Sequence, residues 1–199
     1  GAFSVGVEIG WNHARVVLAG LGGQTLATYK RDYDYPDALT IVEEVAAAVK
    51  RVTIDLEDSD RRRIVGLGLA APGGIGETAS LIPPPGIQST LWADVDLRAA
   101  VAAATGLDVR LVNDGNAACW AEFVAHPDPR PQSFAYLLID TFVAAGIIAE
   151  SRLWEGVTGA SANLGSMLVT DRQGASRFVH EIASIHALRE RWRYVENDP

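Results

Sequence analysis

The sequence predicts an α/β fold in which three closely spaced strands are followed by alternating helices and strands. The three strands are separated only by short turns, which is typical of an antiparallel meander. After them, segments with helical periodicity alternate with short apolar runs, which indicates strands joined through helices. A third observation is a polar turn, Asn113-Asp114-Gly115-Asn116, at the point where an apolar run changes into a helical pattern.

The meander is expected over residues 5–10, 14–19 and 24–29. Trp11-Asn12-His13 joins the first two strands, and Gly22-Gly23 marks the turn before the third. A helix is then expected to begin at Asp37, because the apolar residues that follow recur at helical spacing as far as Val52.

Residues 63–70 form the fourth expected strand, which is apolar enough to be buried on both faces. The loop that follows, residues 71–76, contains Gly73, Gly74 and Gly76. Glycines let a backbone approach a ligand closely, although they also simply form turns. The position of this loop after a central strand favours a ligand role.

The next stretch is expected to contain one irregular crossing, one helix and one strand. Residues 83–86 are too rich in Pro for regular structure, and residues 96–105 have the spacing of a short helix that Gly106 ends. The apolar run 109–112 is expected to be a buried strand, and the helix after it continues to Pro127.

The polar turn therefore places one carboxylate and two amides where a strand becomes a helix. In α/β folds, ligands bind outside the carboxyl ends of strands and near the N-termini of helices. The alternative interpretation is that Asp114 or Asn116 only caps the helix, as such residues commonly do.

Residues 126–131 are rich in Pro and are expected to connect two halves of the chain. Beyond them, strands are expected over residues 134–139 and 143–150, followed by a polar, Gly-rich region with a short strand near residues 167–169. The last element is expected to be one amphipathic helix over residues 176–193, with these apolar residues on one face: Phe178, Val179, Ile182, Ile185, Leu188 and Trp192.

This order of elements, βββαβαβα, is that of the ribonuclease-H-like module, and a second copy is expected to begin near residue 134. Two such modules form the actin-like ATPase (sugar kinase) fold, with a ligand cleft between two lobes. The sequence thus predicts a first lobe over residues 1–130 and the start of an incomplete second lobe over residues 131–199.

The composition argues against a domain that binds nucleic acid by itself. The 17 Lys and Arg residues are outnumbered by 25 Asp and Glu residues, which gives a formal net charge of −8, whereas DNA binding depends on basic groups that neutralise phosphates.

Cys119 is the single cysteine, so no disulfide within the chain is expected, and a reducing cytoplasm suits the sequence. No apolar run is long enough to span a membrane. Because the chain begins at Gly1 without an initiator Met or a signal peptide, we expect a trimmed piece of a longer protein.

Five motifs, in order along the chain, resemble the ROK family (repressors, open reading frames and kinases). Residues 111–122 are similar to its Val-x-Asn-Asp-Ala-Asn-Ala-Ala-x-x-Ala-Glu motif, which is the strongest match. Residues 5–10 resemble its first phosphate-binding hairpin, and residues 66–75 resemble its Gly-x-Gly-x-Ala-x-Pro-Gly strand and loop. The other two matches are Trp92 with Asp96-Leu97, and residues 156–169.

In kinases of this family, the Asp of the Asn-Asp motif is the general base that takes the proton of a sugar hydroxyl as its oxygen attacks the γ-phosphate of ATP. The resemblance places Asp114 at that position, and Asn113 where an amide contacts sugar hydroxyls. It implies a sugar-binding set and a set at the nucleotide position: Asn113, Asp114, Gly73 and Asn163 for the sugar, and Gly10, Asn12, Thr141 and Gly146 for the nucleotide.

The chain departs from the kinase pattern at both phosphate-binding turns. The first should read Asp-x-Gly-Gly-Thr, but Trp11 and Asn12 replace its second Gly and its Thr. The second should read Gly-Thr-Gly-x-Gly-Gly-Gly, but residues 140–146 begin with an Asp and keep, besides Thr141, only the last of its five glycines. The family's sugar-contacting Glu and zinc-binding His are Asn163 and Ser166, and its zinc-binding cysteines have no counterpart over residues 171–180, so no zinc is expected.

Three functional hypotheses follow from this resemblance. The favoured one is the sugar-effector-binding, non-catalytic domain of a ROK-type transcriptional regulator, a repressor, because Asn113-Asp114 is retained while the phosphate-binding turns are eroded. The alternative is an active kinase that transfers the γ-phosphate of ATP to a hexose or amino sugar, with Asp114 as general base and Mg²⁺ as cofactor. The third is a structural relic that binds no small molecule.

Under the favoured hypothesis, the resemblance implies a sugar or sugar-phosphate effector, no cofactor, no membrane contact and a homodimer. DNA would be bound only through a winged-helix domain that precedes residue 1 and is absent from this chain. Trp11 is expected either to fill the former nucleotide cleft or to stack on a sugar ring.

Overall fold

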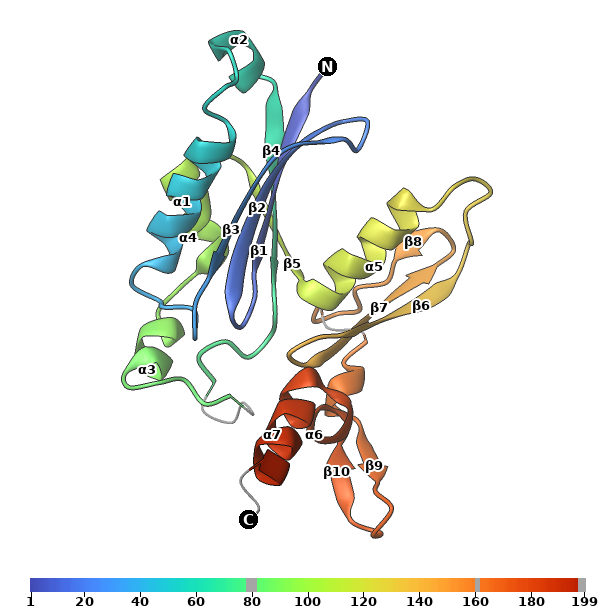
Figure 1. The fold of residues 1–199 in the computed structure, drawn as a ribbon. Coiled ribbons are helices and arrows are strands. Elements are labelled where there is room, and N and C mark those ends of the chain that lie inside the picture. Colours follow the sequence, from blue (N-terminus) through green and yellow to red (C-terminus); the bar gives the residue numbers. More distant parts are fainter. Residues whose placement is uncertain (78–81, 160–161, 197–199) are drawn as a thin grey trace. The chain divides into compact units, whose positions relative to one another are not determined.

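The chain folds into two compact units, Gly1–Val112 and Asn113–Pro199. The structure, a computed structural model, describes residues 1–77, 82–159 and 162–196 (Figure 1). The resemblance over residues 156–169 therefore includes two positions outside the described residues. The second unit begins with helix α5, Asp114–Ala125, because α5 packs against strands β6, Phe134–Ile139, and β7, Val143–Ala149.

The first unit is built on a five-stranded sheet with the order β3-β2-β1-β4-β5. Strands β1, Phe3–Ile9, β2, His13–Gly20, and β3, Thr25–Asp32, form the predicted antiparallel meander. Strand β4, Ile64–Ala71, pairs with β1 in parallel and lies beside β5, Val109–Asn113. The α/β fold predicted from the order of elements is confirmed.

Helices cover one face of this sheet. Helices α1, Ile41–Val52, and α4, Leu97–Thr105, lie side by side on the sheet, and their apolar residues join those of β1, β2 and β4 in one core (Figure 1). The predicted ends of α4 are confirmed. Asp96 caps its start by accepting a hydrogen bond from the Ala99 N–H (2.9 Å), and Gly106 ends it with a left-handed backbone, φ 70°.

Three expectations for the first unit are wrong. Helix α1 begins at Ile41 and not at Asp37, because the Asp37 carboxylate accepts a hydrogen bond from the Leu39 N–H (2.8 Å) in a turn before the helix. Strand β4 is buried on one face only, since Val65 is 63 % exposed on the face that the helices leave uncovered. The third concerns β5, which was expected to be a buried strand, whereas Leu111 is 41 % exposed. The sequence analysis also missed two short helices, α2, Asp58–Arg61, and α3, Gln88–Ala93.

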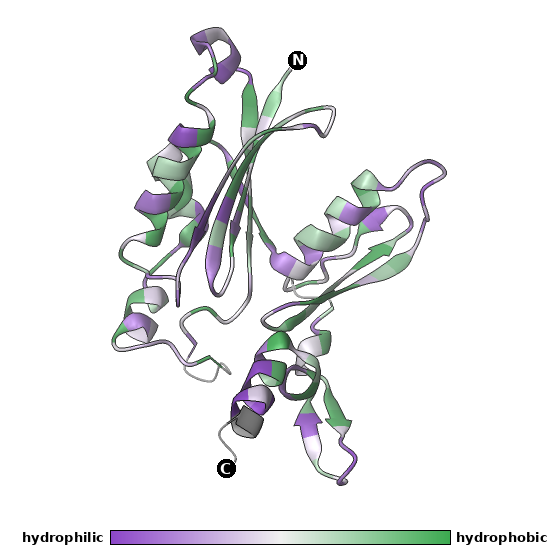
Figure 2. Ribbon diagram, in the orientation of Figure 1, coloured by the Kyte–Doolittle hydropathy of each residue, from purple (hydrophilic) through white to green (hydrophobic). Residues whose placement is uncertain are grey.

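The second unit contains a three-stranded sheet with the order β6-β7-β8, where β8 is Arg152–Leu153. Helix α5 packs on this sheet, and a core forms from Cys119, Phe123 and Ile148 with Phe134, Tyr136 and Leu153 around it. Figure 2 shows hydrophobic segments on these strands and on α5, whereas the Pro-rich connection between α5 and β6 is hydrophilic. Burial raises the pKa of the Cys119 thiol, so this side chain acts as a core residue.

The chain after β8 forms small elements that the sequence predicted only in part. They are a short 3₁₀ helix, Leu164–Ser166, a two-stranded sheet of β9, Leu168–Thr170, and β10, Ser176–Phe178, and the helices α6, Val179–Ala183, and α7, Ile185–Glu196. The single helix expected over residues 176–193 is therefore wrong. Its apolar residues do not share one buried face, since Leu188 is 57 % and Trp192 is 66 % exposed.

The break between α6 and α7 has a visible cause at Ser184, which is fully buried. Its hydroxyl donates to the His180 carbonyl oxygen of α6 (2.6 Å) and accepts from the Ala187 N–H of α7 (3.0 Å). The Ser184 backbone is extended, with φ −79° and ψ 159°. Side-chain hydrogen bonds of this kind compete with helical backbone bonds, which hydrophobic periodicity does not reveal.

Helix α5 lies unusually close to strand β7 because two glycines face each other. A Cβ atom on Gly115 would lie 2.5 Å from the Ala145 carbonyl oxygen, and one on Gly146 would lie 2.4 Å from the Cys119 Cβ atom. Both distances are shorter than van der Waals contact, so no larger residue fits without movement of the backbone. Gly146, which the family resemblance placed at the nucleotide, is thus required by packing.

We predict that Gly146→Ala lowers the free energy of unfolding by about 1–3 kcal/mol, because the added methyl group overpacks the contact between α5 and β7. Urea denaturation followed by circular dichroism measures this change. Gly6→Ala is the matched control, since it adds the same methyl group to strand β1 where no atom lies within 4 Å. Equal stability of the two variants would contradict the packing role of Gly146.

Candidate ligand site at the start of helix α5

The polar turn that the sequence singled out begins helix α5, and its residue Asn113 caps the helix. The Asn113 Oδ1 atom accepts hydrogen bonds from the N–H groups of Gly115 (3.0 Å) and Asn116 (3.4 Å). Neither Asp114 nor Asn116, the two residues considered as caps, is the N-cap. Because the cap uses the oxygen of the Asn113 amide, the Nδ2 group is the part of this side chain that can donate to a ligand.

Asp114 is the first residue of α5 and is partly buried. Its Oδ1 atom accepts a hydrogen bond from the Gly115 N–H (2.8 Å). A carboxylate at this position is stabilised by the positive end of the helix dipole and by the N–H groups of the first turn. The start of α5 therefore combines a carboxyl acceptor with an amide donor, which are two kinds of group that bind sugar hydroxyls.

The turn between β6 and β7, where the resemblance expected a phosphate, is closed by bonds within the chain. The Asp140 N–H donates to the Phe142 carbonyl oxygen (3.0 Å), and the Val143 N–H donates to His180 Nδ1 (3.0 Å). Two N–H groups that could hold phosphate oxygens are thus already used. The expected nucleotide contact Thr141 is buried, with 7 % of its surface exposed.

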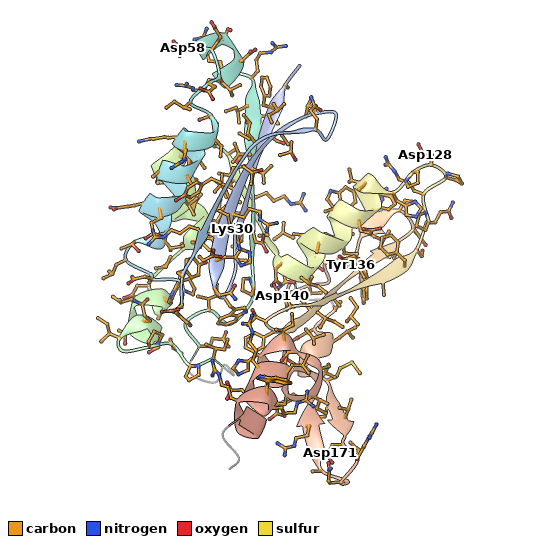
Figure 3. The ribbon with its side chains drawn as sticks, viewed as in Figure 1. Lys30, Asp58, Asp128, Tyr136, Asp140 and Asp171 are labelled. Carbon is orange, nitrogen blue, oxygen red and sulfur yellow. The ribbon has the colours of Figure 1, made fainter. Side chains whose placement is uncertain are left out.

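Helix α7 and three aromatic rings complete this closed turn. The N–H groups of Ile185 and His186, at the start of α7, donate to the carbonyl oxygens of Asp140 (2.9 Å) and Thr141 (3.2 Å). The Phe142 ring lies edge-on to the rings of His180 and His186, with centroids 5.2 and 5.8 Å apart. Figure 3 shows Asp140 at this end of the β6–β7 hairpin.

His180 is held by packing as well as by its hydrogen bond. Burial lowers the pKa of His180, because the charged imidazolium loses hydration. Protonation would also turn Nδ1 from an acceptor into a donor that faces the Val143 N–H. A Cβ atom on Gly165 would overlap this ring, at 1.8 Å from His180 Cε1, so the 3₁₀ helix contacts the imidazole directly.

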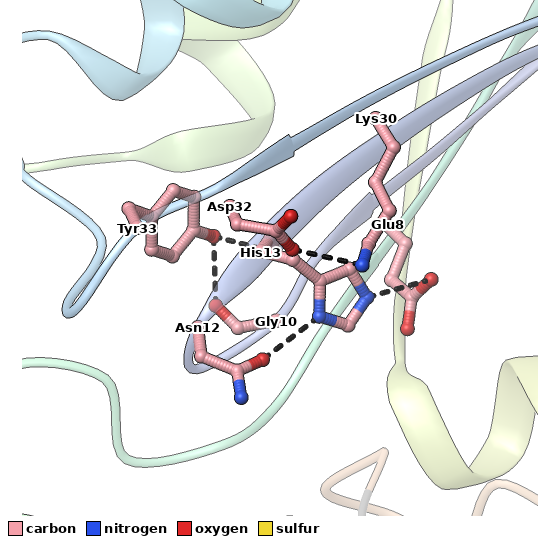
Figure 4. Close-up of polar contacts among 7 residues, drawn as sticks. All are labelled: Glu8, Gly10, Asn12, His13, Lys30, Asp32 and Tyr33. Carbon is pink, nitrogen blue, oxygen red and sulfur yellow. Dashed lines mark hydrogen bonds and ion pairs between the residues drawn. The ribbon is translucent and has the colours of Figure 1, made fainter.

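The hairpin between β1 and β2, in the first unit, is also closed by its own side chains (Figure 4). The Tyr33 hydroxyl lies within hydrogen-bond distance of the carbonyl oxygens of Gly10 (2.8 Å) and His13 (2.7 Å). His13 Nδ1 lies 2.9 Å from Asn12 Oδ1, and His13 Nε2 lies 3.4 Å from a Glu8 carboxylate oxygen. Burial is the main cause that raises the pKa of Tyr33 above its usual value, so its hydroxyl remains protonated as a donor.

Trp11, at the tip of the same hairpin, is buried and contacts Tyr35. Its side chain is 7 % exposed, and its ring meets the Tyr35 ring edge-on with centroids 6.2 Å apart. The Gly10 N–H, which would otherwise point at a phosphate, donates to the His13 carbonyl oxygen (2.8 Å). This burial leaves little of the Trp11 ring exposed to stack on a sugar, and its expected place in a former nucleotide cleft stays a prediction.

The loop after β4 is held by Tyr35 as well. The Gly76 N–H donates to the Tyr35 hydroxyl (2.9 Å), and the Trp92 Nε1–H donates to the Pro36 carbonyl oxygen (3.0 Å). Gly73, the expected sugar contact of this loop, is exposed and has no atom within 4 Å of the position of a Cβ.

Residues 171–180 are the region in which zinc-binding members of the family have cysteines. In this chain, Asp171 lies at the tip of the hairpin that β9 and β10 form (Figure 3). The Asp171 carboxylate accepts hydrogen bonds from the N–H groups of Gln173 (2.9 Å) and Ala175 (2.8 Å), and Arg177 lies 3.6 Å away. The Ala175 N–H and these other donors lower the pKa of Asp171. Among the described residues, no cluster of three or more His, Cys, Asp or Glu side chains is placed to hold a metal ion.

The predicted site residues therefore fall into two groups. Asn113, Asp114, Thr141, Gly146 and Asn163 belong to the second unit, with Asn163 exposed before the 3₁₀ helix. The remaining three, Gly10, Asn12 and Gly73, belong to the first unit.

Sequence reasoning missed the contributions of Asn116, His180 and Tyr33. Asn116 is 1 % exposed, and its Nδ2 atom donates to the Gly159 carbonyl oxygen (2.8 Å), which joins the start of α5 to a turn 43 residues away in the chain. In the sequence, only the position of Asn116 in the Asn-Asp-Gly-Asn turn could have indicated its role. His180 and Tyr33 bind atoms 37 and 20–23 residues distant, so no local pattern identifies them.

Comparison with known proteins gives a consistent match. The model of the ROK family matches residues 4–198. The xylose repressor of Bacillus subtilis (strain 168) is 23 % identical over 167 residues, which cover 84 % of this chain and 42 % of the repressor. A glucokinase of Streptomyces coelicolor is 29 % identical over 164 residues, which cover 81 % of this chain and 48 % of the glucokinase. The chain thus spans less than half the length of these relatives.

Solved structures show the same fold. The ROK family glucokinase of Streptomyces griseus, in complex with glucose and AMPPNP, has a TM-score of 0.75 at 23 % identity, over 98 % of this chain and 62 % of the glucokinase. A ROK family transcriptional regulator, a homolog of the E. coli MLC protein, has a TM-score of 0.70 at 20 % identity, over 100 % of this chain and 51 % of the regulator. In the described part of the chain, no helix has the length and apolar character needed to cross a membrane.

We predict that the stability of the chain falls more steeply between about pH 7.5 and pH 5.5 than the stability of a His180→Asn variant. Because the pKa of His180 is lowered in the folded state, the unfolded chain binds the proton more readily, and acidification favours unfolding. An Asn keeps an acceptor for the Val143 N–H but does not titrate.

Urea denaturation across this pH range measures the difference in slope. His126→Asn is the control, since His126 lies at the end of α5, where its ring contacts the neighbouring Pro127 carbonyl oxygen (2.9 Å). Parallel stability profiles of the wild type and His180→Asn would show that His180 is not the responsible group.

Proposed function

The chain belongs to the ROK family, and on that premise we propose that it is the sugar-effector-binding, non-catalytic part of a ROK-type transcriptional regulator. The observation that supports this proposal best is the closure of both turns expected to hold phosphate. Their N–H groups already donate within the chain: Gly10 to His13, Asp140 to Phe142, and Val143 to His180.

Nucleotide binding would have to break these bonds without a glycine-rich backbone to replace them. Phosphate oxygens are normally held by several N–H groups that converge on one point, and glycines allow the backbone to come close enough. Here Trp11 and Phe142 occupy turn positions with buried or packed rings. The Asp140 carboxylate would add a negative charge beside the negative phosphates, and like charges repel.

The start of α5, in contrast, retains the groups that suit a sugar. Asp114 supplies a carboxylate acceptor for a sugar hydroxyl, and the Asn113 Nδ2 group supplies a donor for a hydroxyl oxygen. Asn163 offers a further exposed amide in the same unit. This combination of neutral amides and one carboxylate favours an uncharged sugar over a sugar phosphate, because the carboxylate repels a phosphate.

The regulator proposal includes partners that this chain would not bind alone. The relatives include xylose repressors, which are more than twice as long as the part that matches. We propose that DNA is bound by a winged-helix domain preceding residue 1, and that the regulator acts as a cytoplasmic homodimer. The net charge of −8 suits an effector domain that does not itself hold DNA.

The second candidate is a sugar kinase, which the glucokinase relatives and the position of Asp114 favour. Asp114 would then act as the general base for a sugar hydroxyl, with ATP and Mg²⁺ as cosubstrate and cofactor. The two candidates differ in one measurable property, the binding of ATP.

We predict that D-xylose, D-glucose or N-acetylmannosamine binds the wild-type chain in isothermal titration calorimetry, and that ATP with Mg²⁺ does not. Asp114→Asn should raise the dissociation constant of the bound sugar about 10- to 100-fold, because a hydrogen bond to a charged group is replaced by one to a neutral amide. Asp171→Asn is the control, since it makes the same chemical change at the tip of the β9–β10 hairpin in the same unit.

Each contrary result has a distinct meaning in this experiment. Heat of binding with ATP and Mg²⁺, together with ADP formation in the presence of a sugar, would replace the regulator proposal by the kinase. Unchanged sugar affinity in Asp114→Asn would remove the start of α5 from the sugar site. If the chain binds none of the sugars tested, the third hypothesis remains, a structural relic that binds no small molecule.

A further inference from the structure

Asn116 is almost fully buried in the second unit, with 1 % of its surface exposed. It lies in the first turn of α5, two residues after Asp114, and its own N–H donates to the cap at Asn113. A buried amide loses its hydration and is normally fully hydrogen-bonded in return. Its presence in this position therefore requires a specific structural reason.

The two halves of the Asn116 amide differ in their surroundings. The Nδ2 atom donates to the Gly159 carbonyl oxygen at 2.8 Å, whereas the Oδ1 atom is buried and has no hydrogen-bond partner in the described structure. The amide cannot simply be rotated, because Oδ1 would then face the Gly159 oxygen and two acceptors would repel each other. The donor is thus the group for which this residue is needed.

The bond to Gly159 joins two segments that are 43 residues apart in the chain. On one side, α5 is held on β7 by the close contact at Gly115 and Gly146. On the other side, residues 156–159 form a turn with positive φ angles at Gly156 (66°) and Gly159 (76°). Among the described residues, and apart from its chain neighbours, no atom lies within 4 Å of the Cβ position of Gly159.

We propose that Asn116 is a positioning residue, which fixes the turn 156–159 to the start of α5 and so sets the shape of the sugar site next to Asn113 and Asp114. This inference rests on the proposed function, because it assumes that a monosaccharide binds at the start of α5. Asn116 does not touch the sugar. It acts through the Gly159 carbonyl oxygen.

The test is Asn116→Asp, which preserves the size of the side chain and replaces the donor by an acceptor. At about pH 7.5 the ionised Asp repels the Gly159 oxygen, and we expect the dissociation constant for D-glucose or D-xylose to rise about tenfold or more. At about pH 5.5 a buried Asp, whose pKa is raised by burial, becomes protonated and donates again. The affinity of the variant should then return toward the wild-type value at the same pH.

Hydrogen exchange measured by mass spectrometry provides a readout that needs no ligand. In Asn116→Asp at about pH 7.5, backbone amides in a peptide covering residues 150–159 should exchange faster than in the wild type, and exchange in β1 and β2 should be unchanged. Thr53→Val is the matched control, because it removes a buried hydrogen bond to a backbone carbonyl, that of Val49 (2.8 Å), in the first unit. It should lower stability without changing sugar affinity or exchange at 150–159.

The outcomes separate this inference from the proposed function. Equal sugar affinity of wild type and Asn116→Asp at both pH values would overturn the positioning role, while the sugar site itself would stand. If residues 150–159 exchange faster in Asn116→Asp than in the wild type, but the wild type binds no sugar, the coupling between the turn and α5 would stand. The absence of sugar binding would then refute the proposed function. Loss of affinity that pH does not restore would show a general loss of structure and would also overturn the inference.

Discussion

The arrangement of the second unit depends on the contact between Gly115 of α5 and Gly146 of β7. Without side chains at these two positions, helix and strand approach so closely that a single methyl group would meet backbone or core atoms. This contact sets the position of the first turn of α5, and with it the positions of Asn113, Asp114 and Asn116. Because protein interiors are densely packed, such contacts do not tolerate added volume. The packing of α5 on β7 therefore fixes the residues of the candidate site.

The polar groups of the turns that were expected to bind ligands either form hydrogen bonds within the chain or can still bind a ligand. The β1–β2 hairpin and the β6–β7 turn belong to the first kind, since their N–H groups are bonded to nearby carbonyl oxygens or to His180. The Asn113 Nδ2 group belongs to the second, because the helix cap uses only the oxygen of that amide. Under the proposed function, the hydrogen bonds of these turns contribute to a preference for a sugar over a nucleotide on the family's fold.

Several features could be read directly from local sequence. Asp96 and Gly106 bound helix α4 as predicted, because a helix cap and a left-handed glycine act within one turn of the chain. The three-stranded meander and the strand before Asn113 were predicted from short apolar runs and turn residues. The resemblance to the ROK family, carried mainly by residues 111–122, was confirmed by the family match over residues 4–198.

Other features depend on partners that are distant in the chain. The exposure of Val65 follows from which face of the sheet the helices cover, and the break at Ser184 follows from hydrogen bonds that compete with a helical pattern. The burial of Trp11 against Tyr35, and the role of His180 at Val143, involve residues 24 and 37 positions apart (35 − 11 = 24). By itself the sequence determined the family, the order of strands and helices, and the presence of an Asn-Asp turn at a helix start. Only the tertiary structure decided which N–H groups, amides and rings are already occupied, because that depends on contacts between segments that local periodicity cannot place together.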